Sequence, residues 1–261
     1  MSNVHRVTNV GKANKLRVSE SVVVSSLWQC PRNAKACFVL AHGAGAGMNH
    51  AFMESVAAAL AARHIATSRF QFPYMERGSK RPDPPKLCHA TVRAAVEDAR
   101  RRTDLPLIAG GRSFGGRMTS QAQAELPLPS VVGLAFLGFP LHPAKRPSED
   151  RAEHLFQTQI PLLFLQGTRD ELADLTLLKA LVARLGKRAT LKLFDDANHS
   201  FHVPARSGRT DAMIFDEMMD GLVEWIDAVI TDSRHRIPIR ISAQLRDRLS
   251  EDRRGSMLPG H

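Results

Sequence analysis

Short apolar runs alternate with longer segments of helical periodicity along most of the chain. The run Ala36–His42 is almost continuously apolar, which is typical of a strand covered on both faces. The Ala-rich segment Phe52–His64, whose apolar residues recur three and four positions apart, is typical of a helix. Further strands are expected over Ser21–Trp28, Ile65–Phe72, Leu105–Gly111, Val131–Pro140, Ile160–Gly167 and Ala189–Phe194, and further helices over Leu87–Arg102, Arg117–Glu125, Leu175–Gly186 and Asp211–Ile230.

This alternation indicates an α/β fold. Strands that alternate with helices form β-α-β units, so the pattern predicts a mostly parallel, doubly wound sheet with helices on both faces. We expect residues 1–20 to form an N-terminal extension and residues 21–231 to form one folded domain. Periodicity fails after that, so residues 232–261 are expected to form a basic, flexible C-terminal tail.

The composition is that of a globular protein. Hydrophobic residues make up 43% and charged residues 24% of the 261 residues, which fits neither a disordered nor a fibrous chain. No apolar run approaches the ~20 residues of a membrane-spanning helix. The basic N-terminus lacks the apolar stretch of a secretory signal, while a transit peptide stays an alternative. Three cysteines, Cys30, Cys37 and Cys88, have neither a disulfide framework nor metal-ligand spacing, so we expect a cytoplasmic protein without a metal.

The formal net charge of +10 leaves several interpretations open. It favours an anionic substrate, or loose contact with nucleic acid or a membrane surface. A solvated basic surface with a basic tail explains it more simply. Because no aromatic residues are interleaved with the basic ones, we expect no specific nucleic-acid site.

The residues that follow each strand carry the candidate chemistry, because ligands of parallel sheets bind outside the carboxyl ends of the strands. After Ala36–His42 comes the glycine-rich loop Gly43–Met48. A dinucleotide fingerprint would need glycine where Met48 stands, and no acidic residue ends the next strand. The loop is better interpreted as small residues whose backbone N–H groups approach a developing oxyanion, with Ala44 or Gly43 as the donor.

After Leu105–Gly111 comes Ser113, flanked two residues away on each side by Gly111 and Gly115. A nucleophile on a sharp strand-to-helix turn needs such small neighbours, because its backbone is strained and crowded. The helix that follows would supply the Phe114 N–H as a second oxyanion donor.

The next two strands deliver an acid and then a histidine. Asp170 follows Ile160–Gly167, with Glu171 and Asp174 as rivals, and His199 follows Ala189–Phe194, with His202 as its rival. The order serine, acid, histidine at successive strand ends is the order of nucleophile, acid and base in an α/β-hydrolase.

The motifs "LAHGAGAGM", "RFQFPYMERGSKRPDPP", "GGRSFGGRM", "LQGTRDEL" and "DANHSFHVP" span residues 40–204. In these motifs the chain resembles the α/β-hydrolase superfamily, and more closely the small, largely uncharacterised bacterial proteins related to dienelactone hydrolase. Similar motifs occur in the hydrolase-like subunit of the non-specific-lethal complex, for which a scaffold role is considered. The resemblance implies a catalytic Ser113, Asp170 and His199, and no cofactor. Dienelactone hydrolases carry cysteine where Ser113 stands, so their substrate is not carried over.

The expected activity is hydrolysis of an ester, thioester or similar acyl bond in a small-molecule substrate. The alternative is a binding or scaffold protein that keeps the fold without catalysis; lyases and perhydrolases share the constellation. Only Leu141–Thr158 lies where larger relatives insert a lid, so little or no lid is expected. Oligomeric state cannot be read from the sequence. Candidate substrate ligands are Arg112 and His142, and the arginines near the strand ends are Arg69, Arg77, Arg112, Arg117 and Arg169.

Overall fold

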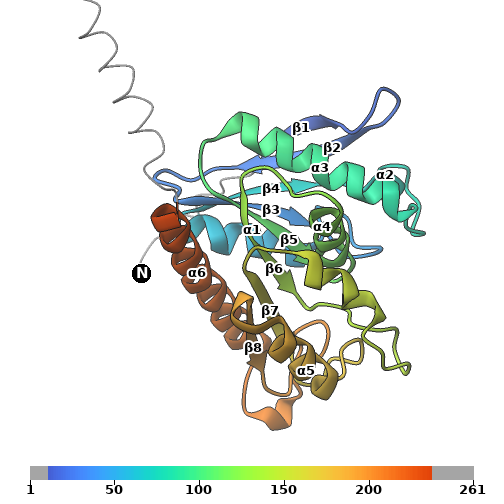
Figure 1. Cartoon of the computed structure of the whole chain (residues 1–261), viewed down its shortest axis with the longest axis vertical. Coiled ribbons are helices and arrows are strands. Elements are labelled where there is room, and N and C mark those ends of the chain that lie inside the picture. Colours follow the sequence, from blue (N-terminus) through green and yellow to red (C-terminus); the bar gives the residue numbers. More distant parts are fainter. Residues whose placement is uncertain (1–10, 237–261) are drawn as a thin grey trace, which may run out of the picture.

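One eight-stranded sheet organises the molecule (Figure 1). The computed structural model describes residues 11–236. The strand order is β1-β2-β4-β3-β5-β6-β7-β8, in which β1 and β2 pair in antiparallel fashion and β3 to β8 are parallel to one another. The strands are β1 (Lys12–Arg17), β2 (Val23–Gln29), β3 (Ala36–Ala41), β4 (Ile65–Phe70), β5 (Leu107–Arg112), β6 (Val131–Leu137), β7 (Leu162–Gly167) and β8 (Ala189–Phe194).

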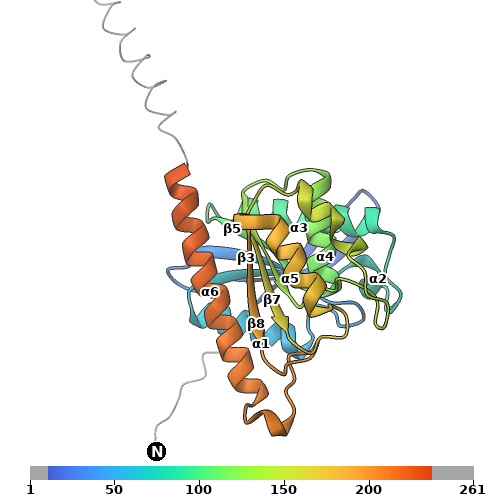
Figure 2. The ribbon, with the colours of Figure 1, turned by 60° about the horizontal axis from the view of Figure 1, so that its bottom comes forward.

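Helices cover both faces of this sheet, as the alternating pattern predicts. Figure 2 shows α6 along one face, with α3, α4 and α5 on the other, and the buried apolar residues divide into two clusters in the same way. The first face carries α1 (Ala51–Ala62) and α6 (Asp211–Arg236). The second carries α2 (Pro73–Glu76), α3 (Pro85–Arg102), α4 (Phe114–Glu125) and α5 (Leu175–Leu185). The expectation of a doubly wound α/β sheet is therefore confirmed.

The central strands are buried along almost their whole length. Every residue of β3, β4 and β7 is buried. β3 and most of β7 are apolar, as expected for parallel strands covered on both faces, whereas β4 also buries Thr67, Ser68 and Arg69. The last strand, β8, lies at the edge of the sheet and is only half-buried. The loops after β3, β5 and β7 therefore leave the best-covered part of the sheet, and the loop with His199 leaves its edge.

The elements depart from the expected ones most clearly at the two ends of the described residues. β1 pairs with β2 over Lys12–Arg17, inside the range expected to be an extension. α6 continues to Arg236 instead of ending at Ile230. The remainder of the expected tail, residues 237–261, and residues 1–10 lie outside the described residues. Within the described residues, no helix combines the length and apolarity that crossing a membrane requires.

The chain changes direction in the sheet at β3. It passes from β3 to β4 on one side and then to β5 on the other. The loops that leave the carboxyl ends of β3 and β5 therefore lead to helices on opposite faces of the sheet, and such a point is the usual ligand position in open α/β sheets. These are the loops that carry Gly43 and Ser113.

Close backbone packing around β5 has no room for side chains. A Cβ on Gly110 would overlap the carbonyl oxygen of Ala135 in β6, and one on Gly111 would overlap that of Ala41 in β3. Both glycines also have positive φ values, +147° and +149°. The spacing of the three central strands therefore depends on glycine at these two positions.

We expect Gly110→Ala to lower the free energy of unfolding by roughly 3 kcal/mol or more, because added volume in a packed interior forces the backbone apart. Gly208→Ala is the matched control. Gly208 is in the left-handed αL conformation, with φ +70° and ψ +7°, but a Cβ there meets nothing within 4 Å, so only the backbone strain of about 1 kcal/mol is expected. Urea unfolding of both variants measures the difference; equal losses would show that the backbone contact with Ala135 is unimportant.

Candidate active site

Ser113 occupies a strained turn between β5 and α4. Its φ of +48° and ψ of −114° lie where residues other than glycine are rare. The Ser113 N–H donates to the Leu137 carbonyl at 3.3 Å, and the Ser113 carbonyl accepts from the Arg117 N–H at 3.1 Å. These bonds hold the turn. The half-buried side chain of Ser113 lies at the start of α4.

The glycines around Ser113 let α4 approach the strands closely. A Cβ on Gly115 would lie 2.5 Å from the His42 carbonyl oxygen, and one on Gly116 would lie 2.8 Å from that of Gly111. Real Cβ atoms do not approach oxygen so closely, so a side chain at either position would displace the helix. The GGRSFGG pattern therefore serves a steric requirement of this strand-to-helix turn.

A continuous chain of hydrogen bonds joins the three residues that follow β5, β7 and β8. The His199 Nε2 and Ser113 Oγ atoms are 2.9 Å apart, and the His199 Nδ1 and Asp170 Oδ2 atoms are 2.7 Å apart. The Asp170 side chain is fully buried, whereas that of His199 is 23% exposed. Accepting the proton of Ser113 would make His199 a cation beside a buried carboxylate, the arrangement of a general base with its orienting acid.

The neighbours of Asp170 fix both of its carboxylate oxygens. Oδ1 accepts from the Leu172 N–H at 2.8 Å, and Oδ2 accepts from the Gln166 side-chain amide as well as from His199. Gln166 is fully buried in β7 and accepts the Phe139 N–H through its own Oε1 at 2.8 Å. Our sequence reasoning missed Gln166. Its signal is a polar residue inside the apolar run of residues 162–167.

The rival acids and the rival histidine lie elsewhere. Glu171 is exposed, and Asp174 caps α5 by accepting the Leu177 N–H at 3.0 Å. His202 is exposed and pairs with Asp211 at the start of α6, with 2.9 Å between Nδ1 and Oδ2. The structure thus brings Asp170 and His199, and none of their rivals, to Ser113.

His42 orients the loop after β3. This fully buried ring accepts the Phe72 N–H at Nε2 (3.0 Å), so the proton lies on Nδ1 and is donated to the Gly43 carbonyl (2.8 Å). The C=O and N–H of a trans peptide point in opposite directions. Because the Gly43 carbonyl points inward to His42, the Ala44 N–H points outward, and Ala44 is exposed.

The second candidate donor is the Phe114 N–H. Phe114 is the first residue of α4, and the first N–H groups of a helix have no acceptor within the helix. Partial positive charge gathers at this end of the helix. The orientation of the peptide after Gly43 favours Ala44 over Gly43 as the partner of Phe114.

The two candidate substrate ligands differ in how their side chains are used. Both ring nitrogens of His142 are bonded to backbone groups: Nε2 accepts the Asp174 N–H at 2.7 Å, and Nδ1 donates to the Pro143 carbonyl at 2.9 Å. This buried histidine therefore ties the loop after β6 to the start of α5. The half-buried Arg112 donates to the Leu137 carbonyl through Nη1 across a long 3.4 Å.

Only one short element stands between β6 and β7, the 3₁₀ helix η1 (Asp150–Gln157). It is fastened to α4 by a second serine–histidine contact, 2.8 Å from His154 Nε2 to Ser120 Oγ. Ser120 is fully buried within α4 and its hydroxyl donates to the Arg117 carbonyl at 3.0 Å. This pair therefore joins two helices and lacks the strained turn of Ser113.

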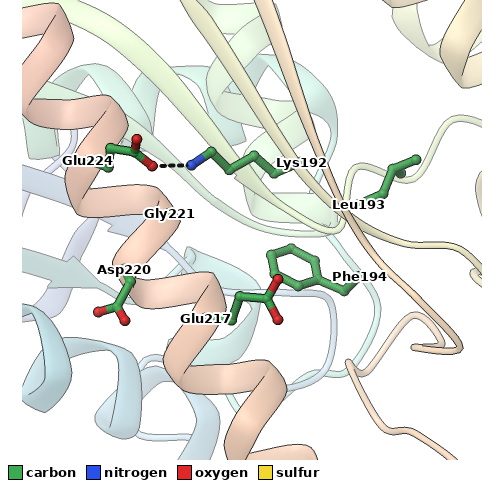
Figure 3. A pocket seen from close by; sticks show the side chains of 7 residues that line it. All are labelled: Lys192, Leu193, Phe194, Glu217, Asp220, Gly221 and Glu224. Atoms are coloured by element: carbon green, nitrogen blue, oxygen red, sulfur yellow. Dashed lines mark hydrogen bonds and ion pairs between the residues drawn. The ribbon is translucent and has the colours of Figure 1, made fainter. Parts of the chain in front are cut away.

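A separate groove lies between β8 and α6 (Figure 3). It has a volume of about 400 Å³, and its charged side chains are already paired: Lys192 with Glu224, Glu217 with Arg209 and Asp220 with Arg63. It contains none of Ser113, Asp170 and His199. The part of the chain that the structure describes holds no group of three or more His, Cys, Asp or Glu residues suited to a metal ion.

The buried His42 predicts a pH-dependent stability. Burial lowers its pKa to about 4, partly offset by its bond to Gly43, whereas a histidine in an unfolded chain titrates near 6.5. Between these values the unfolded chain binds a proton that the folded protein does not, so stability falls as pH falls from about 6.5 to 4, by up to about 1.4 kcal/mol per pH unit. We expect His42→Asn to be less stable at pH 7 but to lose less stability on acidification. Urea unfolding from pH 4.5 to 7 measures both slopes, and identical slopes would contradict this account.

Three solved structures resemble this fold. A serine hydrolase homologue from Coxiella burnetii superposes with a TM-score of 0.62 at 18% identity, covering 82% of this chain and 94% of its own. A serine hydrolase without a lid from Xanthomonas campestris superposes with a TM-score of 0.64 at 21% identity, covering 84% of this chain and 95% of its own. A dienelactone hydrolase from Anabaena variabilis superposes with a TM-score of 0.64 at 18% identity, covering 86% of this chain and 98% of its own. At these identities the likeness concerns the fold alone.

A family model described as an alpha/beta hydrolase domain matches residues 34–227. The matched segment begins just before β3 and ends within α6, so it includes all three loops that carry Ser113, Asp170 and His199. Since the match covers most of the chain, this protein belongs to the alpha/beta hydrolase family.

Proposed function

We propose that this protein is a serine hydrolase that cleaves an ester, thioester or similar acyl bond of a small molecule. The observation that carries the proposal is the unbroken hydrogen-bond chain from the buried Asp170 through His199 to Ser113 on its strained turn. Each member has the environment that its role requires: a desolvated, fully hydrogen-bonded carboxylate, a partly accessible imidazole, and a hydroxyl held at the start of a helix.

In the proposed reaction, the Ser113 Oγ attacks the acyl carbonyl carbon while His199 Nε2 takes its proton. The carbonyl oxygen becomes an oxyanion, which the Phe114 and Ala44 N–H groups stabilise. The intermediate collapses to an acyl-serine as His199 returns the proton to the leaving group. Water then attacks the acyl-serine with His199 as base, and the acid and free Ser113 are released.

The short connection between β6 and β7 supports a site that is open to a small-molecule substrate. Only η1 and the loops beside it lie between β6 and β7.

The three cysteines are free thiols, and two of them are buried. Burial raises the pKa of the Cys88 thiol to about 12, which makes it a poor nucleophile. We therefore assign the nucleophile to Ser113 and place the protein in a reducing compartment, the cytoplasm.

A fluorophosphonate probe tests this proposal without knowledge of the substrate, because it reacts with an activated serine. We expect stoichiometric labelling of the wild type and loss of labelling, by ~10³-fold or more in rate, in Ser113→Ala and His199→Ala. Mass spectrometry of the labelled peptide identifies the modified residue.

Ser120→Ala is the matched control, because Ser120 also contacts a histidine but lies buried within α4. It should be labelled like the wild type. A folded wild type that is not labelled would contradict the proposal and favour a binding or scaffold role for the fold.

The acid is tested by isosteric substitution. Asp170→Asn should lower kcat/KM for an activated ester by ~10⁴-fold, because an amide can neither hold the correct His199 tautomer nor stabilise its charged form. Glu171→Gln and Asp174→Asn are expected to stay within about threefold of the wild type, since neither side chain contacts His199. Steady-state kinetics with para-nitrophenyl esters compare the three variants. A large loss in either control, with Asp170→Asn unaffected, would reassign the acid.

A further inference from the structure

Three of the five arginines near the strand ends have no acidic partner. Arg77 pairs with Asp83, and Arg169 pairs with Asp196 at 3.8 Å. Within residues 11–236, no carboxylate oxygen lies within 4.0 Å of the other three guanidinium groups, which belong to Arg69, Arg112 and Arg117. The charge of these three guanidinium groups is therefore not neutralised by an ion pair within the described residues.

The three cations are used differently. Arg69 is buried beneath the loop after β3 and donates to the Met48 carbonyl at 3.0 Å, which supports that loop. Arg117 lies over the Phe114 ring, 5.9 Å from its centroid. Arg112 is the one whose guanidinium shares a neighbour with the base: a Cβ on Gly138 would lie 3.2 Å from Arg112 Nη1 and 3.5 Å from His199 Cε1.

Two aromatic rings and the loop after β3 hold Arg112 in place. Its Cζ lies 4.9 Å from the centroid of the Phe52 ring and 5.3 Å from that of Phe201, which comes two residues after His199. Its Cγ would lie 3.3 Å from a Cβ on Gly43. The guanidinium is thus fixed between the oxyanion loop and the loop of the base. A pre-organised cation of this kind loses little rotamer entropy on binding a ligand.

The hydrogen-bonding capacity of Arg112 is largely unused. A guanidinium has five N–H donors, and within residues 11–236 the one acceptor of an Arg112 hydrogen bond is the Leu137 carbonyl at 3.4 Å. The Asp170 carboxylate exerts a favourable field on Arg112 but is not in ion-pair contact, and its oxygens already serve His199, Gln166 and Leu172. Burial lowers the pKa of Arg112 to about 10, so the group stays charged at neutral pH. A desolvated cation without a partner is unfavourable in the free protein.

We propose that Arg112 binds a carboxylate carried by the substrate, so that the preferred substrates are acyl esters with a second, anionic group. This inference rests on the proposed serine hydrolase activity and names its substrate class. A carboxylate would supply two acceptors in the plane of the guanidinium and neutralise its charge. A neutral ester would leave the N–H donors of Arg112 without acceptors and its charge without a counterion.

The test compares pairs of esters in which one member carries a carboxylate where the other carries an uncharged group. For a charge on the acyl side, the pair is the para-nitrophenyl monoester of adipic acid and para-nitrophenyl hexanoate. For a charge on the alcohol side, it is para-acetoxybenzoate and phenyl acetate. In at least one pair, we expect Arg112→Met to lower the anionic-to-neutral ratio of kcat/KM by ~10–100-fold, the effect of one charge-assisted hydrogen-bond pair. Arg112→Lys keeps the charge but not the planar, forked guanidinium, so its anionic-to-neutral ratio should lie between those of the wild type and Arg112→Met.

Arg32→Met is the matched control for net charge. Arg32 is exposed and precedes β3, so it lies at the amino ends of the parallel strands, whereas Ser113 lies at their carboxyl ends. Its loss should leave both ratios unchanged. If Arg112→Met lowers the two members of each pair equally, Arg112 only supports the loops and the proposal is wrong. Ratios unaffected by Arg112→Met also overturn it.

Failure of the hydrolase assignment would look different, because the wild type would then cleave none of the four esters and would escape fluorophosphonate labelling. Binding decides the charge proposal in that case. 6-Oxoheptanoate, in which a methyl ketone replaces the ester and leaves no bond to hydrolyse, should bind the wild type ~10-fold more tightly than Arg112→Met by calorimetry. Equal affinities would overturn the carboxylate site independently of catalysis.

Discussion

The left-handed backbone of Ser113 is the constraint on which the rest of the site depends. Holding a serine at φ +48° costs of order 1–3 kcal/mol, and it persists because the Leu137 carbonyl and the first turn of α4 hold it from both sides. The turn also requires β5 to pass against β3 and β6 so closely that Gly110 and Gly111 have no room for side chains. The position of the serine hydroxyl is therefore set by the register of the sheet.

Hydrogen bonds then tie neighbouring strand ends to that fixed point. Gln166 in β7 links the carboxylate of Asp170 to the backbone after β6, and Asp170 in turn orients His199 after β8. On the other side, His42 links the loop after β3 to the backbone after β4. The polar groups that these links bury are all satisfied by one another, which is the condition for a polar network to be stable inside a protein.

The sequence predicts the fold and the order of the site residues because both depend on local patterns. Apolar runs such as residues 36–41 identify buried strands, and parallel strands bring their carboxyl ends to one edge. β1 escaped prediction because Lys12–Arg17 is a polar edge strand in which only Leu16 is fully buried. The last turn of α6 was not predicted because its residues lack an apolar stripe.

Contacts between distant segments explain the rest of what the sequence did not predict. The roles of Gln166 and His42 depend on partners that other strands supply. The same holds for Arg112, whose environment is built by Phe52, from a helix two strands earlier, and Phe201, from the loop after the last strand. Periodicity reports which face a residue occupies, but not which side chain meets it there.

The short η1 segment between β6 and β7 also bears on how the proposed reaction would proceed in time. Where a hinged cover closes a hydrolase, opening or closing it often limits turnover. Here η1, the one helical element between β6 and β7, is fastened to α4 and would not have to move before the proposed substrate binds. Water would then reach an acyl-serine by the same route as the substrate, so the proposed acyl-enzyme would be short-lived.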